Sequence, residues 1–210
     1  MRKNSLILMF LLLSMTLAVA QSKLDGGLYL KTGIAHSYKF QMNEILTNMK
    51  TDKIPIIITL ASLGVHVDYR NVVYSLDIGI GGMGNKQTWS TNLLANLSIG
   101  YQLFLPDENS LIFSGTLSYE LYNVYSYLTK GSLDMEAAIL ITPTQFNVQL
   151  HQFMPGAKIA WRNKFTTIGI GYDVGCIPMS WTSDVVTISN NTKERINRIH
   201  FDIAYDIRKF

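Results

Sequence analysis

The sequence predicts an all-β fold, a closed eight-stranded antiparallel up-and-down barrel that spans a membrane. Three observations predict it: apolar residues alternate with small or polar ones, short and long connections alternate along the chain, and the composition is unusually apolar. Of the 210 residues, 48% are hydrophobic and only 16% are charged, against roughly 25% charged residues in soluble domains. An apolar environment is therefore expected to cover this chain, although no segment after residue 20 is long and uninterrupted enough for a transmembrane helix.

The first twenty residues have the features of a secretory signal peptide. Arg2 and Lys3 form a positive start, an apolar run follows, and Ala18-Val19-Ala20 offers a cleavage site. The apolar run is too short to cross a bilayer, which needs roughly 20 residues. We expect residues 1–20 to be removed and residues 21–210 to form a single exported domain.

The mature chain gives no indication of a nucleic-acid partner. Removing Arg2 and Lys3 leaves 16 of the 18 Lys and Arg residues against 15 Asp and Glu residues, so the net charge falls from +3 to +1. The single Cys176 cannot form an intramolecular disulfide. No His and Cys cluster has the spacing of a metal site, so we expect no cofactor and no metal.

Period-two alternation recurs through the mature chain, as in a wall with one apolar and one polar face. The third segment shows it well, because Tyr74, Leu76, Ile78 and Ile80 alternate with small or polar residues. Pro155-Gly156 predicts a bulge in the sixth segment. The eight predicted strands are 27–38, 56–70, 74–81, 92–103, 111–122, 146–162, 167–174 and 199–208.

Short and long connections alternate strictly between these segments. Short turns are predicted around residues 70–71, 106–109 and 162–164, where turn-forming residues gather. The longer connections are residues 39–54, 84–91, 123–145 and 176–196. Outer-membrane barrels have this asymmetry, with tight periplasmic turns and long extracellular loops, so both termini are expected in the periplasm.

Aromatic side chains are predicted to form two girdles at the membrane interfaces, where Tyr and Trp are enriched. The predicted girdle consists of Tyr69, Tyr74, Tyr101, Trp161 and Tyr205 at the short-turn end, and of Tyr38, Tyr119 and Tyr172 at the long-loop end.

With this alternation, these turns and the terminal Asp206-Ile207-Arg208-Lys209-Phe210, residues 26–210 resemble the small outer-membrane barrels of OmpX and the OmpA transmembrane domain. The resemblance is one of architecture. It implies a place in the outer membrane of a Gram-negative cell envelope, in contact with outer-membrane lipid and lipopolysaccharide. It also implies that the barrel-assembly machinery reads the terminal Phe210, although this residue is one position out of step with the apolar face of its strand.

If the apolar positions face lipid, the other set faces the interior and brings a nearly balanced set of charges with it. An eight-stranded barrel is just wide enough for its own side chains to fill, and buried charges must be paired. We therefore expect a salt-bridged plug in the lumen instead of a channel. Its predicted members are Lys31, Asp68, Arg70, Asp77, Glu120, Lys158, Arg162, Asp173, Asp202, Asp206 and Arg208.

Candidate catalytic residues are few. Some barrels similar to this one remodel lipid A as acyltransferases or deacylases, which requires a serine, a histidine base and an orienting acid. Adjacent His36 and Ser37 point to opposite faces of a strand. The pairs His66 with Asp68 and His200 with Asp202 share a face in the lumen, where a structural histidine is the better interpretation. No catalytic site is predicted.

The sequence thus predicts a non-enzymatic surface protein that acts through its four long loops as a structural, adhesin-like or accessory binding protein, with an extracellular partner. Residues 41–53 could form a short amphipathic helix. Residues 177–181 and 185–188 could extend the last two strands as a hairpin. A lipid-A-modifying enzyme and a soluble lipocalin-like barrel remain alternatives. The latter requires an apolar interior and a polar exterior.

Overall fold

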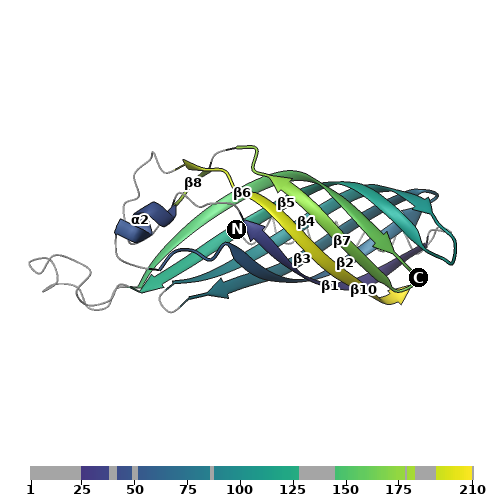
Figure 1. Ribbon diagram of the computed structural model, residues 1–210, viewed down its shortest axis with the longest axis horizontal. Coiled ribbons are helices and arrows are strands. Elements are labelled where there is room, and N and C mark those ends of the chain that lie inside the picture. Colours follow the sequence, from purple (N-terminus) through teal and green to yellow (C-terminus); the bar gives the residue numbers. More distant parts are fainter. Residues whose placement is uncertain are drawn as a thin grey trace, which may run out of the picture.

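Eight antiparallel strands close into an elongated barrel (Figure 1). The computed structural model describes residues 25–37, 42–48, 52–85, 88–127, 145–177, 179–182 and 193–209. Sequential strands are neighbours around the barrel, and β1 pairs with β10 to close it. The predicted fold class is confirmed. The barrel strands are β1 (Asp25–Ser37), β2 (Ile57–Tyr69), β3 (Val72–Gly84), β4 (Thr88–Phe104), β5 (Ser110–Tyr127), β6 (Gln145–Arg162), β7 (Thr166–Val174) and β10 (Asn197–Lys209).

Three small elements lie at the end of the barrel opposite to the C-terminus (Figure 1). Helix α2 (Met42–Asn48) confirms the helix predicted within residues 41–53. Strands β8 (Met179–Ser180) and β9 (Lys193–Glu194) pair with each other, and Thr182 bridges back to Gln149 of β6. The hairpin predicted between the last two strands is therefore present at residues 179–180, as a separate two-stranded sheet and not as a continuation of the barrel strands. Residues 185–188 lie outside the described residues. No helix in the described parts of the chain has the length and apolar character needed to cross a membrane.

The strand register fixes the tilt of the strands. A line of paired residues that starts at Tyr69 and runs once around the barrel returns to β2 at Thr59, a displacement of 69 − 59 = 10 residues. With strands about 4.8 Å apart and a rise of about 3.3 Å per residue, this stagger gives a tilt of about 40°. That value is typical of closed barrels whose interiors side chains fill.

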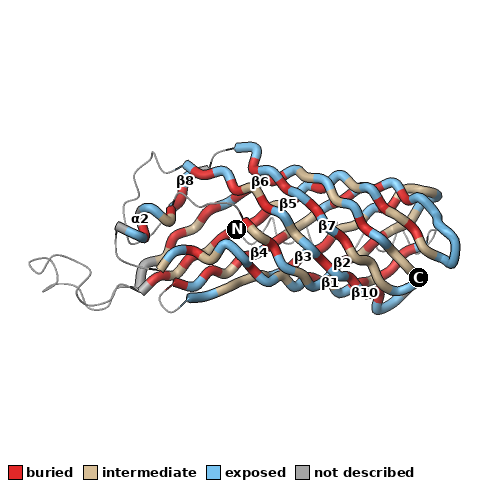
Figure 2. The backbone as a smooth tube through the Cα atoms, in the orientation of Figure 1, coloured by how far each residue is buried: buried red, intermediate tan, exposed pale blue. Residues whose placement is uncertain are grey.

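Burial alternates along the strands, as the alternating colours of Figure 2 show. Large apolar side chains such as Leu30, Ile78 and Leu97 point outward and are about half exposed, whereas Asp77, Ser98 and Asp202 point inward and are buried. The predicted assignment of an apolar exterior and a polar interior is confirmed. It is the reverse of what a lipocalin-like ligand-binding barrel requires.

The bulge predicted at Pro155-Gly156 is absent from the described pairing. The register between β5 and β6 continues without a shift through Leu117–Pro155 and Thr116–Gly156. Pairing of β6 with β7 begins at Gly156, so Pro155, which has no N–H to donate, lies directly beyond the last pair. The end of a ladder accommodates the proline, and the register shifts instead between Leu28 and Tyr29 of β1.

Candidate functional site

Strands β2 to β7 present an uncharged outer wall. Among the described side chains, no Lys, Arg, Asp or Glu takes an outward position on β2 to β7. Six of the predicted girdle residues are exposed on this wall: Tyr69, Tyr74, Tyr101, Trp161, Tyr172 and Tyr205. Tyr119 is partly buried and shares a hydrogen bond of 2.6 Å with His151, while Tyr38 lies outside the described residues. Such a wall suits hydrocarbon and not water.

A row of small and polar residues crosses the outer wall near the long-connection end of the barrel. It runs across five strands through the paired residues Thr59, Gly82, Thr91, Asn123 and Gln149. Near this row the same set of alternate positions still points inward, but its residues become apolar: Val124, Val148 and Leu150 are fully buried. The strands therefore continue past the row around an apolar interior, while Ile57 and Trp89 remain exposed on the outer face.

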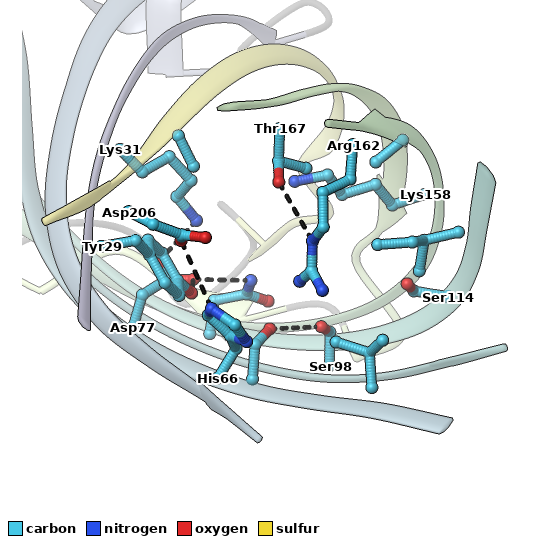
Figure 3. Close-up of a pocket in the computed structure, with 16 residues that line it drawn as sticks. Tyr29, Lys31, His66, Asp77, Ser98, Ser114, Lys158, Arg162, Thr167 and Asp206 are labelled. Atoms are coloured by element: carbon cyan, nitrogen blue, oxygen red, sulfur yellow. Dashed lines mark hydrogen bonds and ion pairs between the residues drawn. The ribbon is translucent and has the colours of Figure 1, made fainter. Parts of the chain in front are cut away.

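We call the half of the lumen nearer the short turns the lower half, and it is centred on Asp77 of β3 (Figure 3). This carboxylate lies 2.6 Å from Lys31 Nζ and accepts hydrogen bonds from the Tyr29 hydroxyl (3.1 Å) and from Asn96 (3.2 Å). Gly64 permits this arrangement, since a Cβ at that position would collide with the Tyr29 ring. The cavity beside these groups measures about 50 Å³, which is room for only a few water molecules.

His66 lies between two carboxylates at the short-turn side of this cavity (Figure 3). Its Nδ1 is 3.1 Å from Asp68 on the same strand, and its Nε2 is 3.3 Å from Asp206 of β10. Asp68 also forms an ion pair with Arg162 of β6 at 2.7 Å. These contacts join strands from three sides of the barrel.

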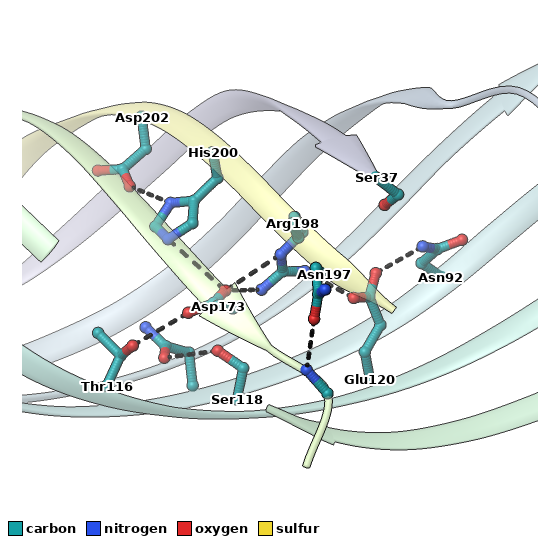
Figure 4. A network of polar contacts seen from close by, with 12 residues as sticks. Ser37, Asn92, Thr116, Ser118, Glu120, Asp173, Asn197, Arg198, His200 and Asp202 are labelled. Atoms are coloured by element: carbon teal, nitrogen blue, oxygen red, sulfur yellow. Dashed lines mark hydrogen bonds and ion pairs between the residues drawn. The ribbon is translucent and has the colours of Figure 1, made fainter. Parts of the chain in front are cut away.

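The upper half of the lumen, nearer the long connections, is centred on Arg198 of β10 (Figure 4). Its guanidinium pairs with Glu120 of β5 at 2.6 Å and binds Asp173 of β7 through both Nε and Nη2. Both carboxylates are fully buried, with Asn92 donating to Glu120 and Thr116 donating to Asp173. Both of these hydrogen bonds go to Oδ2 of Asp173, and charge-assisted hydrogen bonds are roughly twice as strong as neutral ones.

His200 joins the upper network to a third ion pair (Figure 4). Its Nδ1 is 3.2 Å from Asp202 and its Nε2 is 3.6 Å from Asp173, while Lys158 of β6 pairs with Asp202 at 2.6 Å. Gly171 leaves the space that the imidazole occupies, because a Cβ there would overlap the ring. The second cavity, of about 20 Å³, holds no more than a single water.

An apolar cluster covers the network at the long-connection end, and we name it the cap. Met42 and Leu46 of α2 pack with Ile54, Trp181 and Ile196 over the inward side chains of β5 and β6. Trp181 Nε1 donates to buried Glu194, and the hydroxyls of Tyr122 and Ser37 share a hydrogen bond of 3.2 Å. The remaining members of the cap are Tyr122, Val124, Val148, Leu150 and Met154.

Nine of the residues predicted for the charge network line the lumen and form these ion pairs: Lys31, Asp68, Asp77, Glu120, Lys158, Arg162, Asp173, Asp202 and Asp206. The other two are corrections. Arg70 occupies the β2–β3 turn with a φ of 55° and extends over the Tyr69 ring at 5.3 Å. Arg208 is exposed, because the alternation of β10 ends at Asp206. Arg198 was not predicted, although it is the next residue on the inward face of β10 after Asp202 and His200.

The candidate catalytic pairs do not assemble with a serine. Ser37 is buried and its hydrogen bond goes to Tyr122, while His36 points to the opposite face as expected from strand geometry. His151 bonds Tyr119 on the outer wall. In the part of the chain that the structure describes, no group of three or more His, Cys, Asp or Glu is placed to hold a metal ion.

The sequence matches no protein-family model, and no curated protein is significantly similar to it. The chain is similar to several solved structures. Neisserial surface protein A has 9% identity and a TM-score of 0.49, with 87% of this chain and 99% of that chain covered. The attachment invasion locus protein Ail of Yersinia pestis has 8% identity and a TM-score of 0.46, with 89% and 98% covered.

The third structure is a major outer membrane protein of Thermus thermophilus, with 10% identity, a TM-score of 0.49, and 88% and 99% of the two chains covered. Since identity with all three is low, the assignment rests on strand pairing and on the two faces of the wall. The chain is an eight-stranded, all-antiparallel β-barrel of the transmembrane type, with an apolar wall, a charged interior and a covered mouth.

Proposed function

We propose that this barrel spans the outer membrane of a Gram-negative cell envelope and acts as a surface structural or binding protein, with the long connections as its working parts. The single observation that carries the proposal is the combination of an uncharged wall with an interior whose charges are paired with one another. Outer-membrane lipid and lipopolysaccharide are the partners that the wall requires. The barrel-assembly machinery is the partner that insertion requires.

A channel function is opposed by two closures in series. The Arg198 network crosses the lumen from β10 to β5 and β7, and the cap lies over it. Between the closures and the short-turn end, the cavities hold only a few waters. We therefore expect no steady ion conductance from the reconstituted protein in a planar lipid bilayer. A stable conductance of porin size would contradict the plugged lumen.

A display function is supported by how the long connections are anchored. Helix α2 contributes two side chains to the cap, and residues 179–182 pair with β6 and β9. Strands β4 to β6 extend past the polar row and hold these segments from below. Binding residues on loops are most effective when a rigid scaffold positions them, and this barrel supplies one.

Surface labelling of intact cells tests the display proposal. A short epitope inserted after Asn191, in the long connection between β7 and β10, should bind antibody on intact cells. The matched control carries the same epitope after Glu108, an exposed residue in the short β4–β5 turn with a φ of 59°. This control should be labelled only after the outer membrane is permeabilised. Labelling of the control alone on intact cells would show the opposite orientation and would overturn the proposal.

A further inference from the structure

A groove is hollowed into the outer wall where β1, β2 and β3 lie side by side. It measures about 650 Å³, whereas the two cavities of the lumen measure about 50 and 20 Å³. Its floor is low because Thr32 of β1 and Ala61 of β2, which are paired neighbours, have small side chains. Larger apolar side chains stand around this floor: Leu30, Leu63, Ile78, Ile80, Leu93 and Ile203.

The floor of the groove is apolar in character, although one threonine forms part of it and another lies above it. Thr32 Oγ1 donates to the carbonyl oxygen of Leu60 at 3.3 Å, and Thr59 Oγ1 donates to that of Gly82 at 2.9 Å. Within a bilayer, polar groups have to be satisfied by the protein itself. Lys31 also borders the groove, but its ammonium turns inward and forms the ion pair described above. The occupant that this surface suits is therefore apolar.

The groove leads towards the long-connection end of the barrel. Ile80 and Leu93, a cross-strand pair at its side, lie close to the connection between β3 and β4. The next outward positions on β3 are Gly82 and Gly84, which have no side chains to block the path. In the orientation proposed above, this end faces the outer leaflet of the membrane, whose lipid is lipopolysaccharide.

A cation lies at the end of this path. Asn85, which follows Gly84, donates to the carbonyl oxygen of Lys53 at 2.9 Å, and the Thr88 hydroxyl donates to that of Asp52 at 2.7 Å. These two hydrogen bonds hold residues 52 and 53 against the ends of β3 and β4. The Lys53 side chain is exposed, whereas Asp52 is partly buried. An exposed lysine at a membrane surface attracts anionic lipid headgroups.

We propose that this groove holds one acyl chain of a lipopolysaccharide molecule, with a phosphate of the same molecule beside Lys53. A hollow in a wall surrounded by lipid favours an occupant that fills it, because empty space forfeits van der Waals contacts. A hydrocarbon chain matches the apolar floor, and the phosphorylated sugars of lipopolysaccharide carry the charge that complements the lysine. This inference rests on the outer-membrane location proposed above and names the lipid that one part of the wall binds.

Mass spectrometry of the intact barrel, released from detergent micelles, tests the proposal. Protein extracted from the outer-membrane fraction and washed extensively in detergent should carry one lipopolysaccharide molecule. Ala61→Phe fills the floor of the groove and should lose this bound lipid. Ala157→Phe is the matched control and should keep it, because Ala157 is an exposed outward residue of β6, on the opposite side of the barrel. The mobility shift on boiling shows that each variant is folded.

A second pair of variants tests the contact with the headgroup. Lys53→Gln should lower the ratio of lipid-bound to free barrel about fivefold, which corresponds to about 1 kcal/mol for one cation at a membrane surface. Lys164→Gln, at an exposed lysine in the short β6–β7 turn, is the control and should leave the ratio unchanged. Because Lys53 lies in a connection outside the barrel strands, this comparison decides the matter even if Ala61→Phe does not fold.

Four results would overturn the proposal: a washed wild-type barrel without lipid, a phospholipid in place of lipopolysaccharide, a lipid that Ala61→Phe retains, or a second copy of the chain that Ala61→Phe releases. Each of them leaves the outer-membrane location intact, because the protein is taken from that fraction. Absence of the protein from the outer-membrane fraction would instead contradict the location, and the inference with it.

Discussion

Replacing Arg198 with Met tests whether the upper network stabilises the barrel. The arginine side chain is 3% exposed, and its partners Glu120 and Asp173 are fully buried. Methionine keeps much of the side-chain volume but leaves both carboxylates without their cation. Breaking a buried ion pair in this way costs about 3 to 5 kcal/mol, which lowers the equilibrium constant for folding roughly a hundredfold or more.

The assay is a urea titration of the barrel in detergent micelles, followed by the mobility shift between folded and unfolded bands. Arg208→Met is the matched control, since it makes the same substitution at an exposed position of the same strand, and surface changes usually stay within about 0.5 kcal/mol. Adding Glu120→Gln and Asp173→Asn to Arg198→Met should recover part of the loss, because the unpaired charges disappear. A free energy of unfolding for Arg198→Met equal to that of Arg208→Met would refute the reasoning.

Three further predictions concern the lower network, the wall and the cap. Asp77→Lys would place a second ammonium where Lys31 Nζ now lies 2.6 Å from a carboxylate, so the refolded fraction on gels should fall sharply, whereas Asp107→Lys in a turn should refold normally. Leu97→Arg puts a charge on the lipid-facing wall and should cost about 2 to 4 kcal/mol in a urea titration in lipid vesicles; Leu105→Arg, in the β4–β5 turn, is the control, and equal losses would argue against a membrane-embedded wall. Trp181→Ala removes the largest loop side chain of the cap and should cost about 3 to 5 kcal/mol, measured by the same titration, while no loss would mean that the cap does not contribute to folding.

The strands, their order and the two faces of the wall could be predicted because they depend on local patterns. Alternation with period two and turn-forming residues at regular intervals are properties of neighbouring residues. The ends of β4 and β5 that lie nearest the long connections were missed for a physical reason. At the row of small and polar residues, Asn123 points outward while Val124 and Leu150 pack inside. A pattern of apolar residues facing outward cannot detect a segment where that pattern is inverted.

The charge network could be predicted as a set of residues but not as a set of pairs. The alternation of side chains along a strand shows which residues face the lumen, and it correctly places Asp77 and Asp202 there. It does not show that Arg198 reaches Glu120, a residue 78 positions away in the sequence. That contact depends on the stagger of the barrel, which sets the height at which each strand crosses the axis. Arg70 and Arg208 were assigned inward because parity was extended into a turn and a strand end, where it no longer holds.

The most direct test of the central claim is the mobility of the protein in the outer-membrane fraction, compared with and without boiling on a denaturing gel. A closed, hydrogen-bonded barrel resists detergent at room temperature and should migrate as a compact band that shifts to its full denatured position only after boiling. Recovery of the protein in soluble extracts, with one unchanged band under both conditions, would contradict an apolar wall embedded in the outer membrane.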